Sequence, residues 1–209
     1  PVRDIPQRDA VGLVSAHPAH RLRGSTGGRG GTGVCAREGA ELVKKHSGAS
    51  EVLVFDHTIR IGDEQAMKAI NARPPVKGVH NDYTETSAPR RLREIAGDTA
   101  AERRFKKRWA IIQAWRPIRG TVMIDPLGIC DGRTIPQTGF ILVQRRYKDR
   151  TGEVYHIAYH PAHEWFSLPQ LKRDAAMLFK VVDPDPAVPG NFPDHRAFRD
   201  PNPPRPPPP

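Results

Sequence analysis

The sequence predicts a mainly β protein with flanking helices, of the double-stranded β-helix or jelly-roll type, either complete or lacking its last strand. Short apolar runs rich in β-branched and aromatic residues recur through the second half of the chain, separated by turn signals. Helical patterns are confined to the first half. A series of short strands is typical of sandwiches and jelly rolls, whereas strands alternating with helices would predict a parallel sheet.

The composition divides the chain into three parts. Pro (22) and Gly (18) are over-represented among the 209 residues and gather at the two ends. We therefore expect a flexible Gly/Pro-rich segment over residues 1–36, the jelly-roll domain over 37–200, and a proline-rich tail over 201–209. The glycine tract at 24–33 is not followed by the Lys of a phosphate-binding loop, so it does not predict a nucleotide site.

Helices and two strands are predicted in the first half. Helical patterns cover residues 37–46, 65–71 and 88–96, and Gly48 and Gly97 are the expected stops of the first and last. Strand patterns cover residues 51–60 and 76–82, the second of which follows a break at Pro74 and Pro75.

The remaining strands are predicted in the second half. Strand-like runs cover residues 109–116, 121–124, 139–147, 153–159, 165–166 and 176–182. The first is the strongest and ends before Pro117. Residues 149–152 (DRTG) predict a turn between the strands at 139–147 and 153–159.

Charge and cysteine usage limit the classes of partner. The net charge is +10, with basic runs at 90–93 and 103–108. No aromatic residues for base stacking are interleaved in a recognised pattern, so a solvated helical face that attracts an anionic substrate is favoured. A basic nucleic-acid-binding module is the alternative. Cys35 and Cys130 have no paired spacing, which predicts a reducing cytoplasm. No apolar run approaches the ~20 residues of a bilayer span.

One short motif carries the candidate chemistry. His80 and Asp82 are two residues apart on an extended segment, so their side chains lie on the same side of the strand. His195, from a different strand, could complete the set. Two imidazoles and a carboxylate on one face suit Fe(II) and leave positions open for a 2-oxo acid and dioxygen. The spacing alone is weak, because nine histidines offer several such combinations.

Several further blocks resemble a known family in their order and spacing. They are residues 54–60 (VFDHTIR), 79–85 (VHNDYTE), 112–118 (IQAWRPI), 126–131 (PLGICD), 178–180 (LFK) with Asp183, and 195–201 (HRAFRDP). From about residue 38 to residue 201 the chain resembles the AsaB-like hydroxylase/desaturase group of Fe(II)/2-oxoglutarate-dependent oxygenases. The resemblance implies a double-stranded β-helix in which His80, Asp82 and His195 bind iron.

The same resemblance implies an enzyme that hydroxylates or desaturates a small organic substrate of the secondary-metabolite type. Dioxygen and 2-oxoglutarate would be consumed, giving succinate and carbon dioxide. Arg116 and Arg205 are the candidates for binding the carboxylate of 2-oxoglutarate, because a guanidinium can bind a carboxylate bidentately. For Arg116, a structural ion pair at the barrel rim is an equal alternative.

The chain departs from the family pattern at two places. After the distal His, prolines stand where family members continue with an Arg-x-Ser block and a last hydrophobic strand, so a truncated, inactive family member is the alternative. Gln113 stands where Asn is expected. Tyr83 and Asp131 are candidates for groups that orient the ligands.

The other histidines have structural interpretations. His57 is expected to be an interior residue with its hydrogen bonds satisfied, in preference to a pocket residue. His156, His160 and His163 form an HxxxHxxH series that could indicate zinc. On a strand followed by a turn they would not share a face, and no Cys or carboxylate follows at ligand spacing.

Overall fold

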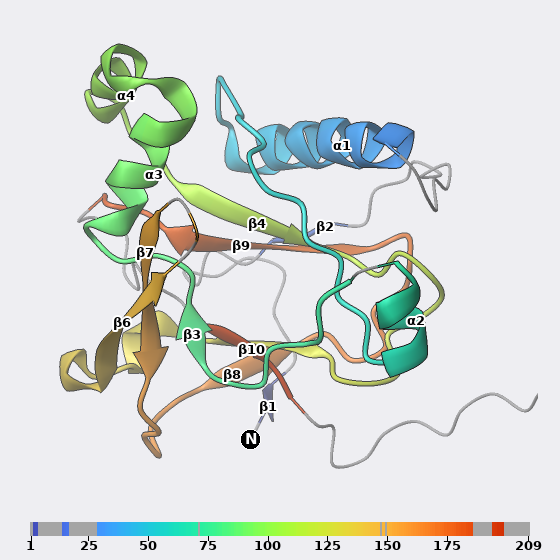
Figure 1. Cartoon of the computed structure of the whole chain (residues 1–209). Coiled ribbons are helices and arrows are strands. Elements are labelled where there is room, and N and C mark those ends of the chain that lie inside the picture. The colour runs from blue at the N-terminus through green and yellow to red at the C-terminus, as the bar shows by residue number, and fades with distance from the viewer. Residues whose placement is uncertain are drawn as a thin grey trace, which may run out of the picture.

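A computed structural model of the chain describes residues 2–3, 14–16, 29–70, 72–146, 148, 150–185 and 194–198, with side chains from Ala36 onward. In these residues two β-sheets carry the fold; α1, α3 and α4 lie on the side of the smaller sheet, and α2 lies apart from them (Figure 1). The helices are α1 Arg29–Ser47, α2 Glu64–Ala69, α3 Ser87–Ala96 and α4 Asp98–Phe105. Two short 3-10 turns, Gly132–Thr134 and Gln137–Gly139, precede the longest hairpin.

The strands pair almost entirely antiparallel. They are β1 Val2–Arg3, β2 Val14–Ala16, β3 His80–Asn81, β4 Ile111–Trp115, β5 Leu127–Cys130, β6 Phe140–Arg146, β7 Thr151–Ile157, β8 Trp165–Ser167, β9 Ala176–Val182 and β10 His195–Ala197. The larger sheet has the order β1-β8-β5-β10-β3-β7-β6, and the smaller has the order β2-β9-β4. Only β1 and β8 run parallel among the described pairs. The mainly β, jelly-roll prediction is confirmed.

The hydrophobic core lies between the two sheets. Leu127 and Ile129 of β5 in the larger sheet pack in one cluster with Met177, Phe179 and Val181 of β9 in the smaller sheet. Every residue of β5 is buried, and so are six of the seven residues of β9. Burial along a whole strand means that both of its faces are covered, which is expected for strands inside a sheet and not at its edge. The core therefore holds the two sheets at a fixed separation.

Most predicted elements are present, with changed bounds. The strong strand pattern at 109–116 corresponds to β4, and the patterns at 139–147, 153–159, 165–166 and 176–182 correspond to β6, β7, β8 and β9. Gly48 and Gly97 end α1 and α3 with φ angles of 71° and 77°, a conformation that glycine adopts at little cost. The first helix starts at Arg29, eight residues before its predicted start, and so includes the end of the glycine tract.

Two predicted strands are wrong, and one is much shorter than expected. Residues 51–60 are extended, but only Arg60 forms a bridge, to Arg73, because the segment has no neighbouring strand among the described residues. Residues 121–124 are irregular, with one backbone bond from Val122 to Leu171. Of residues 76–82 only His80–Asn81 are strand. β-propensity alone does not make a strand without a partner.

The division into residues 1–36, 37–200 and 201–209 stays a prediction. The tail over 201–209 lies outside the described residues. Within the part of the chain that the structure describes, no helix is both long and apolar enough to cross a membrane.

Ile129 tests the account of the core. Its side chain is fully buried in β5, so Ile129→Ala leaves a cavity and should lower the free energy of unfolding by about 2–5 kcal/mol. Ile141→Ala on β6 is the matched control, because Ile141 is 51% exposed and its truncation should change stability by less than about 0.5 kcal/mol. Denaturant unfolding of both variants checks this, and equal losses would contradict the proposed core.

Candidate metal centre

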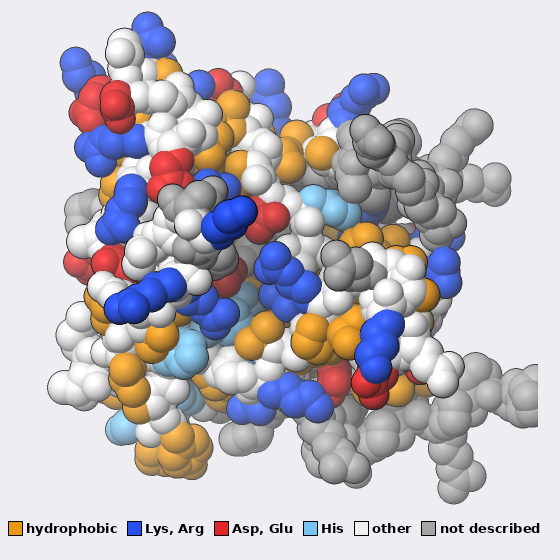
Figure 2. Space-filling view, in the orientation of Figure 1, with side chains coloured by type: hydrophobic (Ala, Val, Ile, Leu, Met, Phe, Trp, Pro, Cys, Tyr) orange, Lys and Arg blue, Asp and Glu red, His pale blue; other side chains and the backbone are white. Residues whose placement is uncertain are grey.

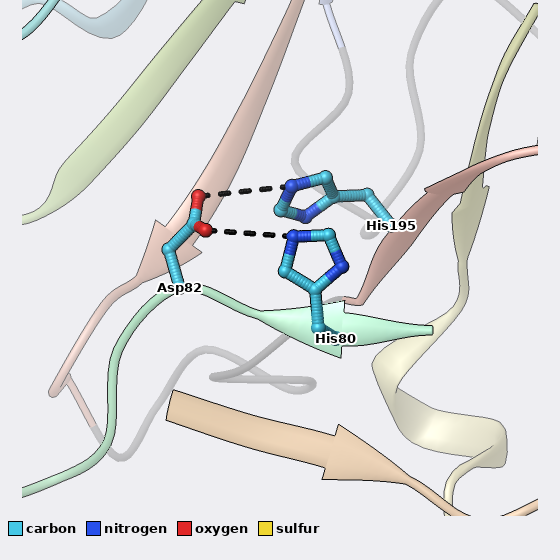
Figure 3. A group of neighbouring side chains, drawn as sticks. All are labelled: His80, Asp82 and His195. Carbon is cyan, nitrogen blue, oxygen red and sulfur yellow. Dashed lines mark ion pairs between the residues drawn. The ribbon is translucent and has the colours of Figure 1, made fainter. Parts of the chain in front are cut away.

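His80, Asp82 and His195 converge between the two sheets, although His195 is far from the others in sequence (Figure 3). One potential ligand atom from each lies within 4.8 Å of the other two. The Nε2 atom of His80 is 3.5 Å from Oδ1 of Asp82, and Nε2 of His195 is 3.7 Å from Oδ2. Within the described residues this is the only group of three or more His, Cys, Asp or Glu side chains with such spacing.

Strand pairing accounts for this convergence. β10 lies between β5 and β3, and its register sets His195 directly opposite His80. Side chains of directly opposed residues lie on the same face of a sheet, so both rings point toward the smaller sheet. The ring centroids are 4.5 Å apart, and the His195 ring also contacts Phe179 of β9 at 5.2 Å. Asp82 follows immediately after β3, which brings its carboxylate to the same pair of rings.

A backbone contact sets the tautomer of His80. Its Nδ1 atom is 2.9 Å from the carbonyl oxygen of Gly78, which can only accept a hydrogen bond. Nδ1 must therefore carry the proton, and the lone pair lies on Nε2, the atom that faces Asp82. Histidine ligands of metals commonly have this arrangement, with one nitrogen donating to a backbone carbonyl and the other binding the ion.

The opposite sheet positions the carboxylate. The side-chain amide of Gln113, on β4, donates a short hydrogen bond to Oδ2 of Asp82. Asn81, between the two ligands, donates from Nδ2 to the carbonyl of Val181 on β9 at 2.9 Å and is fully buried. These two bonds connect the segment that carries His80 and Asp82 to two strands of the smaller sheet.

The electrostatics favour the protonation states that metal ligands require. Burial raises the pKa of Asp82, but the hydrogen bond from His80 and the charges of His195 and His80, which these rings supply when they are protonated, together with the charge of Arg60, outweigh burial and lower the pKa to about 2. Burial lowers the pKa of His195 to about 4. At neutral pH the cluster therefore offers a charged carboxylate and an unprotonated imidazole, which a metal ion can bind without displacing protons.

The donor set fits a first-row divalent metal. Bonds of about 2 Å to imidazole and carboxylate place neighbouring donor atoms about 3 Å apart. The two contacts of 3.5 and 3.7 Å need only small side-chain adjustments to reach that spacing. Two imidazoles and one carboxylate on one face are the donor set of non-haem Fe(II) oxygenases. Within the described residues, no further His, Cys, Asp or Glu belongs to this group.

The cluster lies in a large cleft. The cleft has a volume of about 2710 Å³ and is lined by β4, by residues 51–62 and by parts of α1 and α3. Ligand pockets commonly measure about 300–1,000 Å³, so this space can take a co-substrate and an organic substrate together. Phe55 and Tyr83 pack edge to face in the wall, with ring centroids 6.4 Å apart. The wall beside the cluster is therefore partly aromatic.

Of the two arginines predicted to bind the carboxylate of 2-oxoglutarate, the structure describes only Arg116. Arg116 follows β4 and lines the cleft, but its guanidinium pairs with Glu38 of α1 at 3.1 Å. This is the rim ion pair that the sequence allowed, and binding of a co-substrate carboxylate by Arg116 stays a prediction. Arg205 lies outside the described residues.

The remaining candidate residues, Asp131 and the histidines outside the cluster, do not join the metal-binding group. Asp131 accepts hydrogen bonds from the guanidinium of Arg133 and is not in contact with the cluster. His57 is exposed and lines the cleft, so its interpretation as an interior residue is wrong: the segment around it has no sheet partner to cover it. His160 and His163 are ring neighbours at 5.8 Å but form no metal group with His156.

Two features at the cluster were missed by sequence reasoning. Gln113 was noted only as a replacement for Asn, and no sequence signal indicates which side chain it contacts across the sheets. Asp194 is fully buried beside His195, and neither of its carboxylate oxygens has a hydrogen-bond partner among the residues that the structure describes. Burial raises the pKa of Asp194 to about 8, so its carboxyl group is protonated at neutral pH.

The two-sheet fold, with two histidines and a carboxylate gathered between the sheets, defines the class of jelly-roll domains with a mononuclear metal-binding face. The family model described as an oxidoreductase/YMDC permease-like domain matches residues 33–209. The chain belongs to this family, and its relatives include the hydroxylase/desaturase group that the sequence resembles.

Two relatives illustrate the relationship. The alpha-ketoglutarate-dependent dioxygenase phiK of a fungal species is 31% identical over 155 residues, which cover 71% of this chain and 55% of that protein. The hydroxylase/desaturase asaB of Aspergillus flavus is 30% identical over 115 residues, 48% of this chain and 50% of that protein. The chain thus spans about half the length of the curated relatives it matches.

A solved structure supports the fold. The iron and alpha-ketoglutarate-dependent endoperoxidase NvfI superposes with a TM-score of 0.81 over 97% of this chain and 76% of that chain, at 23% sequence identity. Similarity at this level of identity shows that the two chains share the jelly-roll fold.

Gln113 tests the geometry of the cluster. Because its amide positions Asp82, Gln113→Ala should weaken metal binding by about 10–100-fold, the usual effect of removing a group that orients a ligand. Isothermal titration with Mn(II), which does not oxidise during the measurement, gives the affinity. Gln144→Ala, on the exposed face of β6, is the control and should leave it unchanged. Equal affinities in wild type and Gln113→Ala would exclude the positioning role.

Proposed function

We propose that the chain is an Fe(II)/2-oxoglutarate-dependent hydroxylase or desaturase that acts on a small organic substrate of the secondary-metabolite type. The observation that carries the proposal is the convergence of His80, Asp82 and His195 in the lining of a large cleft. The names of the relatives support the same cofactors, since they include dioxygenases dependent on alpha-ketoglutarate and on Fe(II). Dioxygen and a small molecule would then be the partners.

His80, Asp82 and His195 would hold the iron. When bound there, Fe(II) and 2-oxoglutarate supply the activation of dioxygen that oxidises a C–H bond, while 2-oxoglutarate loses carbon dioxide to give succinate. The protein contributes a fixed set of donors. The Gly78 carbonyl holds the His80 ring, and the Gln113 amide holds the Asp82 carboxylate. Ligands that are positioned in advance do not have to be ordered when the metal enters.

The walls of the site would limit access of water and position the substrate. Phe179 covers the His195 ring from the smaller sheet and is 1% exposed, so water cannot approach from that side. The aromatic rings of Phe55 and Tyr83 offer an apolar surface to the reacting part of a substrate.

Arg116 and Arg205 remain proposed ligands of the co-substrate carboxylate. For Arg116 this requires the guanidinium to exchange Glu38 for the ligand, or to bind both. We propose a reducing compartment such as the cytoplasm as the location, which is consistent with the buried thiol of Cys130 forming no disulfide within the described residues.

The proposed function predicts a spectroscopic signal. Anaerobic protein with Fe(II) and 2-oxoglutarate should develop a metal-to-ligand charge-transfer band in the visible region. His80→Ala should lose it, because one of three ligands is removed. His160→Ala, which removes an exposed histidine outside the cluster, is the matched control and should keep the band. Absence of the band in well-folded wild-type protein would contradict the proposal and favour an inactive family member.

A further inference from the structure

Strand β6 lies at an open edge of the seven-stranded sheet. It pairs with β7 on one side, and no strand of the described residues lies on the other. The strand, Phe140–Arg146, contains no Pro, so its outer edge can accept another strand along its length. Ile141 and Leu142 point to opposite faces of the sheet and are 51% and 52% exposed. Both faces of this edge strand are therefore incompletely covered in the described structure.

Apolar exposure continues beside the start of the strand. Tyr159 is 88% exposed, and a hydrogen bond from the Ala158 amide to the Gly139 carbonyl holds its loop next to Phe140. Figure 2 shows hydrophobic side chains at the lower left of the molecule, on the side where Figure 1 places β6. Exposed apolar side chains grouped in this way commonly mark an interaction surface.

The hydrogen bonds of β7 show which backbone groups of β6 point outward. The amide of Ile157 donates to the carbonyl of Val79, on the β3 side of β7, so Ile157 and the opposed Phe140 form a pair without mutual hydrogen bonds. Phe140 therefore directs its own N–H and C=O groups to the open edge. Because the pattern alternates, the same holds for every second residue along β6, which are Leu142, Gln144 and Arg146.

The sequence of β6 is complementary to itself. It runs from apolar to basic, as FILVQRR. In an antiparallel pair centred on Val143, Phe140 lies opposite Arg146 of the second copy. Ile141 lies opposite Arg145 in the same way. The aliphatic part of each arginine can cover the apolar side chain opposite it, and the guanidinium of Arg146 can lie over the Phe140 ring.

Backbone and charge both favour this alignment. Leu142 lies opposite Gln144 of the second copy, and both residues direct their N–H and C=O groups to the shared edge. At the usual rise of about 3.3 Å per residue, Arg145 is about 13 Å along the strand from its own copy. This distance exceeds the Debye length of about 8 Å at physiological ionic strength, so their repulsion is largely screened. A parallel pair would instead place each arginine beside its own copy.

We propose that β6 pairs antiparallel with β6 of a second copy of this chain, which gives a two-fold dimer with a sheet that continues across the interface. Each copy uses its β6 edge in the contact, so the assembly closes at two copies. The inference goes beyond the proposed function and does not depend on whether the metal centre binds iron. A contact made mainly by one strand is small, so we expect a concentration-dependent dimer that dissociates in dilute solution.

Sedimentation velocity over a series of protein concentrations tests the assembly. Wild type should shift from one copy to two as the concentration rises, and no further. Leu142→Lys should raise the dissociation constant by about tenfold or more, because it replaces an apolar contact with a charge near the basic half of the second strand, and it acts twice in a two-fold dimer. Ile70→Lys is the matched control, because Ile70 is 58% exposed and lies outside β6, and it should leave the constant unchanged.

Gln144→Pro tests the backbone contact separately. It removes an outward N–H that the β6–β7 pair does not use, so the hairpin keeps its hydrogen bonds while the second strand loses a donor. Dimer formation should weaken by a similar factor. Circular dichroism shows whether each variant is folded, and Leu142→Lys, at a half-exposed position, decides the test if Gln144→Pro disturbs the hairpin.

Cysteine cross-linking tests the alignment. In the proposed pair Val143 lies opposite its own copy at a position without mutual hydrogen bonds, where Cα atoms are about 4.5 Å apart and a disulfide can form. Val143→Cys should therefore give covalent dimers under mild oxidation. Arg146→Cys is the matched control, because it would be about 20 Å from its own copy and should not cross-link.

The outcomes are distinct. Wild type that remains a single copy at every concentration, or that assembles beyond two copies, overturns the proposed dimer. A dimer that Leu142→Lys and Gln144→Pro both leave intact overturns the β6 interface. Cross-linking of Arg146→Cys as readily as of Val143→Cys overturns the antiparallel alignment.

Discussion

The pairing of β10 with β3 is the constraint on which the site depends. It sets His195 opposite His80 and so brings together residues that are far apart in the sequence. β10 is held in place by β5 on its other side, and β5 is fully buried against the strands of the smaller sheet. The hydrophobic core therefore fixes the position of the distal histidine, and any loss of packing at β5 would move a ligand.

The smaller sheet adds the second constraint. Gln113 of β4 and the Val181 carbonyl of β9 hold the segment between the two nearer ligands, so Asp82 is oriented from one sheet and attached to the other. A cluster built across two sheets cannot form before the sheets pack. Burial then has a chemical consequence, since it keeps His195 unprotonated at neutral pH, where the low pKa of Asp82 also keeps that carboxylate ionised. The packing of the two sheets and the protonation states of these three side chains therefore both favour binding of a metal ion.

The ligand candidates could be predicted from the sequence because they belong to short ordered blocks, but their surroundings could not. The contact of Gln113 with Asp82 depends on how two sheets face each other, and that information is not local. Residues 51–60 have strand-like composition yet form a wall of the cleft, because no strand lies beside them in the described structure. The pairing of Arg116 with Glu38 depends on where α1 rests. Pattern and spacing therefore predict the metal centre better than the cleft around it.

X-ray absorption at the iron edge, on protein loaded anaerobically with one equivalent of Fe(II), tests the metal centre most directly. We expect one bound iron whose scattering contains two imidazole ligands and oxygen donors, with the imidazole contribution reduced by half in His195→Ala. Iron that does not bind, or that binds without imidazole scattering, would contradict the assignment of His80, Asp82 and His195 as its ligands.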